Sequence, residues 1–218
     1  MPISAAPTDT PRPEITLITD RHRSRNRLAE LVRAAAAAGV DYVQVREKDL
    51  PAAALLALVG ELREAIAERP TRLLVNGRLD VALAAGIHGV QLPENGLSVA
   101  AVRRAFPHLL IGASCHSVES ALRAEAQGAS FILFGPVFPT PGKETRATGP
   151  RPLADLARRL RIPVHAVGGI DAAHVPLLSG TGAHGVAAIR LFLETPPELL
   201  AAVLAGRRAT ALLDAHRT

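Results

Sequence analysis

His116 is the side chain of this sequence best suited to proton transfer. It ends a short apolar run, in the segment SCHS at 114–117, with serines close by on both sides. Histidine titrates near neutral pH, so a positioned imidazole can remove a proton and then return it. A surface histidine that begins the next helix would leave the same pattern, so residue type and position leave both interpretations open.

Two consecutive glycines, Gly168 and Gly169, indicate an anion site. They precede Asp171 and a predicted helix, and bare backbone N–H groups near a helix N-terminus bind phosphate. A plain glycine turn capped by Asp171 is the alternative. Their position favours phosphate, which we expect on the N–H groups of Gly169, Ala188 and Ile189. We further expect Gly169→Val to fill the phosphate space and leave the fold intact.

The other potentially reactive side chains are expected to have structural roles. Cys115 is the single cysteine, so it forms no internal disulfide, and strand alternation should point it away from His116. His165 lies inside an apolar run and is expected to be a core histidine with its hydrogen bonds satisfied. The remaining histidines are expected in loops or on the surface, and they are His22, His88, His108, His174, His184 and His216.

Eight short apolar runs must position these residues. They alternate with longer segments rich in alanine, leucine and arginine, and their nearly continuous apolar character is typical of strands covered on both faces. In the intervening segment 97–106, Val99, Val102 and Phe106 have helical spacing, and Ser98 is placed to cap that helix. The expected strands are 14–20, 42–48, 72–76, 89–92, 110–115, 131–137, 163–170 and 185–190.

A weak internal repeat indicates how the strands are arranged. Gly39, Gly86, Gly128 and Gly182 each stand between a predicted helix and the next strand, where glycine can take the left-handed conformation that ends a helix. They precede every second strand. Eight strands alternating with helices predict one (β/α)8 barrel, a TIM barrel of the α/β class, over residues 14–214, after a disordered tail at 1–13. In such barrels the active site lies at the carboxyl ends of the strands.

Composition restricts the partners. The net charge of +5 and a pI of about 10.5 favour anionic ligands. Aromatic residues are 3% of the chain and the basic residues are scattered, so nucleic acid is not expected. No apolar run approaches the roughly 18 residues of a membrane span, and the N-terminal residues lack the apolar segment of a signal peptide. We therefore expect a cytoplasmic protein that binds neither nucleic acid nor membrane.

Four motifs resemble the thiamine phosphate synthase superfamily. They are LITD at 17–20, VQVREK at 43–48, GPVFPTPGK at 135–143 and VGGI at 167–170. The sequence departs from the synthases where their metal binds, because those enzymes hold Mg²⁺ with an aspartate after the third strand and another after the fourth. Here these segments read NGR at 76–78 and QLPENG at 91–96, so neither aspartate has a counterpart.

At these two segments the sequence resembles another branch of that superfamily, the TenI-type thiazole tautomerases. This resemblance extends to NGRLD at 76–80, IHGVQLP at 87–93, FPHL at 106–109 and SCHS at 114–117, where His116 matches the catalytic histidine. It implies an isomerase that converts a phosphorylated, carboxylated dihydrothiazole with an exocyclic double bond into the aromatic thiazole carboxylate phosphate used to make thiamine. It implies no metal and no cofactor, and a homodimer.

The substrate-binding residues follow from this resemblance and from the strand ends. Arg46, Lys48 or Lys143 could meet the substrate carboxylate, and the sequence does not choose among them. Gln44 and Asn76 could contact the substrate or order the floor of the pocket. The full set of expected substrate-binding residues is Gln44, Arg46, Lys48, Asn76, Thr140, Lys143, Gly169, Ala188 and Ile189.

Two other functions stay open. One is a thiamine phosphate synthase with an altered metal site, and the other is a regulatory barrel that catalyses nothing. If His116 is not the base, Lys48 and Glu47 are the next candidates.

Overall fold

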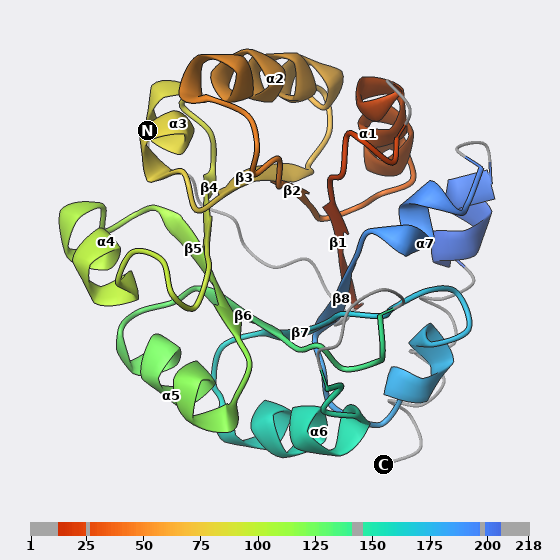
Figure 1. The fold of residues 1–218 in the computed structure, drawn as a ribbon. Coiled ribbons are helices and arrows are strands. Elements are labelled where there is room, and N and C mark those ends of the chain that lie inside the picture. The colour runs from red at the N-terminus through yellow and green to blue at the C-terminus, as the bar shows by residue number, and fades with distance from the viewer. Residues whose placement is uncertain (1–12, 25–26, 141–145, 197–198, 206–218) are drawn as a thin grey trace.

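The structure, a computed structural model, describes residues 13–24, 27–140, 146–196 and 199–205. In this part of the chain eight parallel strands close into a barrel in sequence order, with β8 beside β1. Figure 1 shows the helices as a ring outside the strands. The predicted (β/α)8 barrel is confirmed. Its strands are β1 (Glu14–Ile18), β2 (Tyr42–Val45), β3 (Arg72–Asn76), β4 (Gly89–Leu92), β5 (Leu110–Cys115), β6 (Phe131–Phe134), β7 (Val164–Val167) and β8 (Gly185–Ala188).

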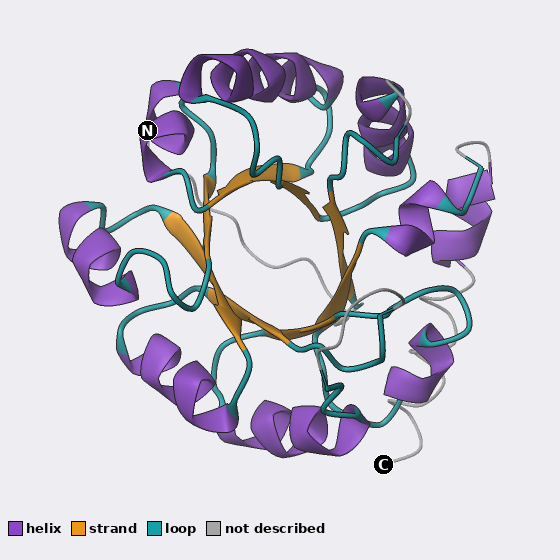
Figure 2. Cartoon of the chain, viewed as in Figure 1, coloured by secondary structure: helices purple, strands orange, loops and turns teal. Residues whose placement is uncertain are grey.

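Helices cover the outer face of the sheet (Figure 2). The connection from β7 to β8 differs from the others because it holds only the short 3-10 helix η1 (Val175–Leu178). The predicted tail at 1–13 lies outside the described residues except for Pro13, as do residues 206–214 of the predicted domain. The α-helices are α1 (Leu28–Ala37), α2 (Ala52–Ala65), α3 (Leu79–Ala84), α4 (Val99–Ala105), α5 (Val118–Ala126), α6 (Pro150–Arg159) and α7 (Arg190–Leu193).

The strands end where the candidate site begins. Strands β3, β4 and β5 have the predicted bounds, whereas β1, β2, β6, β7 and β8 stop two or three residues earlier than predicted. At those ends the backbone leaves the sheet: Gly168 and Gly169 take positive φ after β7, and Arg190 already begins α7. The apolar pattern continues beyond the sheet because the loop residues there are also buried.

Local signals account for the helix ends. Gly39, Gly86, Gly128 and Gly182 all have positive φ, between 60 and 92°, as the internal repeat predicted. Ser98 caps α4 by accepting a hydrogen bond from the N–H of Ala101 at 3.4 Å. Gly39, Gly86 and Gly128 follow α1, α3 and α5, and only four residues separate each of these helices from the next strand, so these connections at the amino end of the barrel are short.

Two apolar cores hold the barrel. The larger one fills the space between the strands and the helices. The smaller one fills the barrel itself and includes Tyr42, Leu74, Phe131 and Leu133. Gly112 makes room for this inner layer, because a Cβ atom there would lie 2.0 Å from the Gln91 side chain and 2.5 Å from that of Phe131. The barrel is therefore a packed core, and ligands have access only at its ends.

Candidate active site

His116 follows the end of β5, and its side chain is 62% exposed. Its Nδ1 atom contacts the carbonyl oxygen of Gly135, at the end of β6, and its Nε2 atom lies 3.9 Å from a carboxylate oxygen of Glu94. If Nδ1 donates its hydrogen to the Gly135 carbonyl, Nε2 is left as the proton acceptor. The Glu94 carboxylate attracts the imidazolium that forms when Nε2 takes a proton. This arrangement suits a single base that returns the proton it removes.

Two hydrogen-bonded pairs of polar side chains form the floor of the barrel end. Gln44 donates to Asn76 at 3.0 Å, and Gln91 donates to Ser114 at 2.9 Å. The side-chain oxygens of both glutamines are buried and have no hydrogen-bond partner among the described residues. The structure thus brings Gln44 and Asn76 together and adds Gln91, which was not among the predicted site residues. A buried amide oxygen without a partner is an acceptor available to a ligand or a water molecule.

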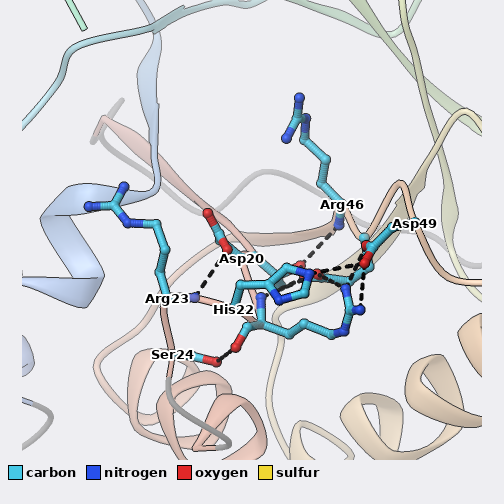
Figure 3. A network of polar contacts seen from close by, with 9 residues as sticks. Asp20, His22, Arg23, Ser24, Arg46 and Asp49 are labelled. Carbon is cyan, nitrogen blue, oxygen red and sulfur yellow. Dashed lines mark hydrogen bonds and ion pairs between the residues drawn. The ribbon is translucent and has the colours of Figure 1, made fainter. Parts of the chain in front are cut away.

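The ends of β1 and β2 carry a network of charged side chains (Figure 3). Arg46 is partly buried and Lys48 is exposed. Glu47, between them, is buried and accepts hydrogen bonds from the Thr19 hydroxyl and from Arg21. Because its oxygens are already bonded inside the protein, Glu47 is poorly placed to be the alternative base. In the charged motif at 43–48, Glu47 is therefore enclosed by the protein, whereas Arg46 and Lys48 remain accessible to solvent.

The loop after β7 is more constrained than the sequence analysis expected. Gly168 and Gly169 are followed by a turn, and the expected helix is replaced by η1, whose four residues begin at Val175. Asp171 accepts hydrogen bonds from the N–H groups of Ala173 and His174, so the capped turn considered as the alternative is present. The anion site proposed there rests on loop N–H groups and has no long helix behind it.

Arg190 adds a positive charge to this loop. Its Nη2 atom donates to the Gly169 carbonyl at 3.2 Å and to the Asp171 carboxylate at 3.1 Å. His174 Nδ1 lies 2.7 Å from the other Asp171 oxygen, and its ring packs on Phe138 after β6. Burial raises the pKa of Asp171, but its hydrogen bonds with His174 and the backbone outweigh burial and hold that pKa low. Arg190 was not among the predicted site residues, although a basic residue at the end of the last predicted strand was a signal for it.

A Val or Ala side chain at Gly169 would not enter free space. An added Cβ would lie 2.5 Å from the carbonyl oxygens of Phe138 and Pro139, and φ at Gly169 is +68°. The expectation that Gly169→Val would leave the fold intact is therefore wrong, because the side chain meets backbone. Ala188 is buried at the end of β8, Ile189 and Thr140 are partly buried, and Lys143 lies outside the described residues.

The residues predicted to be structural have that character. Cys115 is buried under α5, and burial raises the pKa of its thiol to about 11, so it packs as an apolar residue. His165 is fully buried with Nε2 2.8 Å from Glu14, but its Nδ1 has no partner among the described residues, so its hydrogen bonds are only half satisfied. His174 is partly buried and His216 lies outside the described residues. The other histidines expected in loops or on the surface are exposed, and they are His22, His88, His108 and His184.

The acidic residues near the mouth do not suit a magnesium ion. Mg²⁺ takes oxygen ligands, chiefly carboxylates and substrate phosphates. Both oxygens of Asp80, after β3, already bond Arg78, at 2.9 and 2.6 Å, and Glu94, after β4, faces His116. Among the described residues no group of three or more histidine, cysteine or acidic side chains could hold a metal ion. The donors present thus do not fit the metal site of the synthases.

A closed barrel with polar groups at the carboxyl ends of its strands has the architecture of TIM-barrel enzymes. Residues 15–192 match the TMP-TENI family, whose description is thiamine monophosphate synthase. The match covers most of the chain, which therefore belongs to this family. Among the described residues, no helix has both the length and the apolar character needed to cross a bilayer.

Individual relatives are similar over nearly the whole barrel. A Geobacter sulfurreducens protein, provisionally named a thiamine-phosphate synthase, is 46% identical over 184 residues, 83% of this chain and 86% of the relative. A Methanoculleus marisnigri thiamine-phosphate synthase is 40% identical over 180 residues, 81% and 85% of the two chains. The structure of a thiamine phosphate pyrophosphorylase from Pyrococcus furiosus superposes with a TM-score of 0.83 at 31% identity, covering 91% of this chain and 96% of that one.

Proposed function

We propose that this chain is a thiazole tautomerase, which isomerises a phosphorylated carboxy-dihydrothiazole to the aromatic thiazole carboxylate phosphate. The observation that carries the proposal is the environment of His116: its Nδ1 contacts the Gly135 carbonyl, and its exposed Nε2 lies 3.9 Å from the Glu94 carboxylate. The names of the relatives favour a different member of the family, thiamine-phosphate synthase, which is the second candidate.

The proposed reaction needs only proton transfer. Nε2 of His116 removes the proton from the ring carbon that bears the carboxylate, and the same proton or one from water is added at the exocyclic carbon. The ring becomes aromatic, no atom is gained or lost, and the histidine returns to its starting state. A base that serves both steps must lie over one face of the ring, and the phosphate, which does not react, can hold the ring there.

The rest of the site would hold the two anionic groups of the substrate. The N–H groups of Gly169, Ala188 and Ile189 would bind the phosphate, with Arg190 beside them. A cation from the β2 side of the mouth would hold the carboxylate. Neutral amides, rather than acids, line the floor between these ends, as at Gln44. This distribution suits a substrate that carries an anionic group at each end.

The two candidate functions differ in their need for metal. We expect the purified protein to convert the carboxy-dihydrothiazole phosphate, followed by ultraviolet absorbance, at the same rate with and without EDTA. The same preparation given aminopyrimidine diphosphate, thiazole phosphate and Mg²⁺ should form no thiamine phosphate above background. Thiamine phosphate formation that needs Mg²⁺, without isomerase turnover, would instead establish the synthase. Tight binding of the thiazole product without either turnover would indicate a regulatory barrel.

A further inference from the structure

Glu47 is a buried carboxylate to which the proposed chemistry gives no task. It is 6% exposed, at the start of the loop after β2. A buried charge is costly unless hydrogen bonds and opposite charge compensate it. Here one oxygen accepts from the Thr19 hydroxyl at 2.5 Å, both accept from the Arg21 N–H at 3.2 Å, and the Arg21 guanidinium lies 3.5 Å away. This degree of compensation indicates a role in holding the loops in place.

The hydroxyl of Thr19 connects Glu47 to Arg46. Because Thr19 donates its only hydroxyl hydrogen to Glu47, its oxygen is free to accept the backbone N–H of Arg46, at 3.0 Å. The N–H of Thr19 in turn donates to the carbonyl of Gln44 at 2.9 Å. These bonds fix the backbone of Arg46 beyond the end of β2, where the sheet no longer does so.

An outer layer of ion pairs locks the two loops together. Arg21, from the β1 loop, binds both oxygens of Asp49, from the β2 loop, at 2.6 Å each, and His22 reaches the same carboxylate at 2.9 Å. Paired hydrogen bonds of this kind constrain the relative orientation of the groups. Figure 3 shows these contacts as one cluster beside His22 and Asp49. The loops after β1 and β2 are thereby joined from the buried Glu47 out to the surface.

The side chain of Arg46 takes no part in this cluster. In Figure 3 it extends away from the ion pairs, and no hydrogen bond or ion pair within the described part of the chain involves its guanidinium. Arg46 lies two residues beyond Gln44, whose side chain points into the barrel, so alternation directs it over the mouth. A free guanidinium has the planar pair of donors that matches a carboxylate.

We infer that Thr19 and Glu47 are positioning residues that fix Arg46 to bind the carboxylate of the substrate. The inference rests on the proposed function for the identity of that carboxylate. It selects Arg46 over Lys48, and Lys143, the third cation that the sequence left open, lies outside the described residues. Lys48 is exposed, and among the described residues no side-chain hydrogen bond like that of Thr19 supports its backbone.

The test compares two ligands that differ only in the carboxylate. Binding of thiazole carboxylate phosphate and of thiazole phosphate is measured by calorimetry, and the ratio of the two dissociation constants reports the carboxylate contact. The wild type should prefer the carboxylated ligand, and Arg46→Gln should bring the ratio close to one. Thr19→Val and Glu47→Gln should each reduce the preference by roughly 2- to 10-fold, the equivalent of one hydrogen bond. Thr19→Ser, which keeps the hydroxyl, should restore it.

Thr71→Val is the matched control. Thr71 is also buried, at 2% exposure, and its hydroxyl donates to the Val40 carbonyl at 2.7 Å just before β3, at the amino end of the barrel. It loses a buried hydroxyl in the same way as Thr19→Val, so it should lower the melting temperature while leaving the ligand ratio unchanged. If Thr19→Val does not fold, Glu47→Gln and Arg46→Gln still carry the comparison.

Three results would overturn the inference. They are a wild type without preference for the carboxylated ligand, an Arg46→Gln variant that keeps the preference, and Thr19→Val and Glu47→Gln variants whose ratio equals that of Thr71→Val. Failure of the proposed function is separate, because it is measured by turnover. A wild type that binds with the expected preference but does not isomerise the dihydrothiazole contradicts the tautomerase and supports the positioning of Arg46.

Discussion

At the scale of the residue, His116 combines an exposed ring with a fixed orientation. The carbonyl of Gly135, just after the neighbouring strand β6, contacts Nδ1, so the proposed mechanism assigns the base to Nε2. Sequence position suggested the residue, but this partner lies 19 positions away and could not be read from the local pattern. The residue type was predictable from the sequence, and its contact with Gly135 was not.

Replacing His116 by asparagine should separate proton transfer from binding. The asparagine amide can still donate to the Gly135 carbonyl, but it accepts no proton. A positioned general base contributes about 10²–10⁴ in rate, so kcat should fall by that range, toward its upper end if the histidine serves both steps. Product affinity should change little. In D2O the wild-type product should carry deuterium in the methylene formed from the exocyclic carbon.

His108→Asn is the control for this substitution, since His108 is exposed in the turn after α4. Its turnover should match that of the wild type. Near-normal turnover of His116→Asn would end the mechanism. Lys48 would then be the first candidate for the base, because Glu47 is buried and bonded.

At the scale of the element, local patterns predicted strands and helix ends better than the loops between them. The helix-ending glycines and the Ser98 cap act within a few residues, so the sequence displays them directly. Thr19 and Glu47 are 28 residues apart, and their bond forms only when β1 and β2 lie side by side. The role of Arg190 was also not predicted. The predicted eighth strand included this residue, whereas in the structure it begins α7.

Arg190 ties the loop after β7 to the end of β8, so it should matter for a phosphorylated ligand. Arg190→Gln removes the positive charge beside Gly169, and hydrogen bonds to charged groups are worth about 1.5–3 kcal/mol. We expect KM for the phosphorylated substrate to rise about tenfold or more, with a much smaller change for the analogue that lacks phosphate. Equal losses for both ligands would mean that Arg190 only supports the loop.

Arg158→Gln provides the comparison for Arg190. Arg158 is exposed on α6 and pairs with Asp155 three residues earlier in that helix. Removing its charge lowers the net charge of the protein by the same amount as Arg190→Gln. Its KM for the phosphorylated substrate should stay at the wild-type value, which excludes a general effect of charge.

At the scale of the whole molecule, the barrel is closed at its amino end by a polar contact between distant strands. Glu14 on β1 lies 2.8 Å from His165 on β7 and accepts from the Tyr42 hydroxyl on β2 at 3.3 Å. The rings of Tyr42, Phe131 and His165 pack on one another beside it. This cluster lies at the opposite end of the strands from His116, so its effects should concern stability and leave the chemistry unchanged.

Glu14 should make the stability of the protein depend on acid pH. Burial raises the pKa of Glu14, but the hydrogen bonds with His165 and Tyr42 and the attraction of nearby positive charge outweigh burial and lower it from its ordinary value of 4.5. A carboxyl group whose pKa is lower in the folded protein stabilises the fold above its unfolded-state pKa. That stabilisation is lost as the pH falls through the folded-state pKa. We therefore expect the melting temperature of the wild type to decline below about pH 4.5 more steeply than that of Glu14→Gln.

Glu61→Gln, which removes an exposed carboxylate from α2, should keep the steep acid decline of the wild type. The measurement is the melting temperature of the three proteins between about pH 3 and pH 7, together with turnover at neutral pH. At neutral pH, Glu14→Gln should melt below the wild type yet isomerise the substrate at the same rate, because the cluster is remote from the catalytic end. As the pH falls the two melting curves should converge. Parallel curves across this range would show that the Glu14 carboxylate contributes nothing to the acid sensitivity, and that closure of the barrel depends on its apolar layers alone.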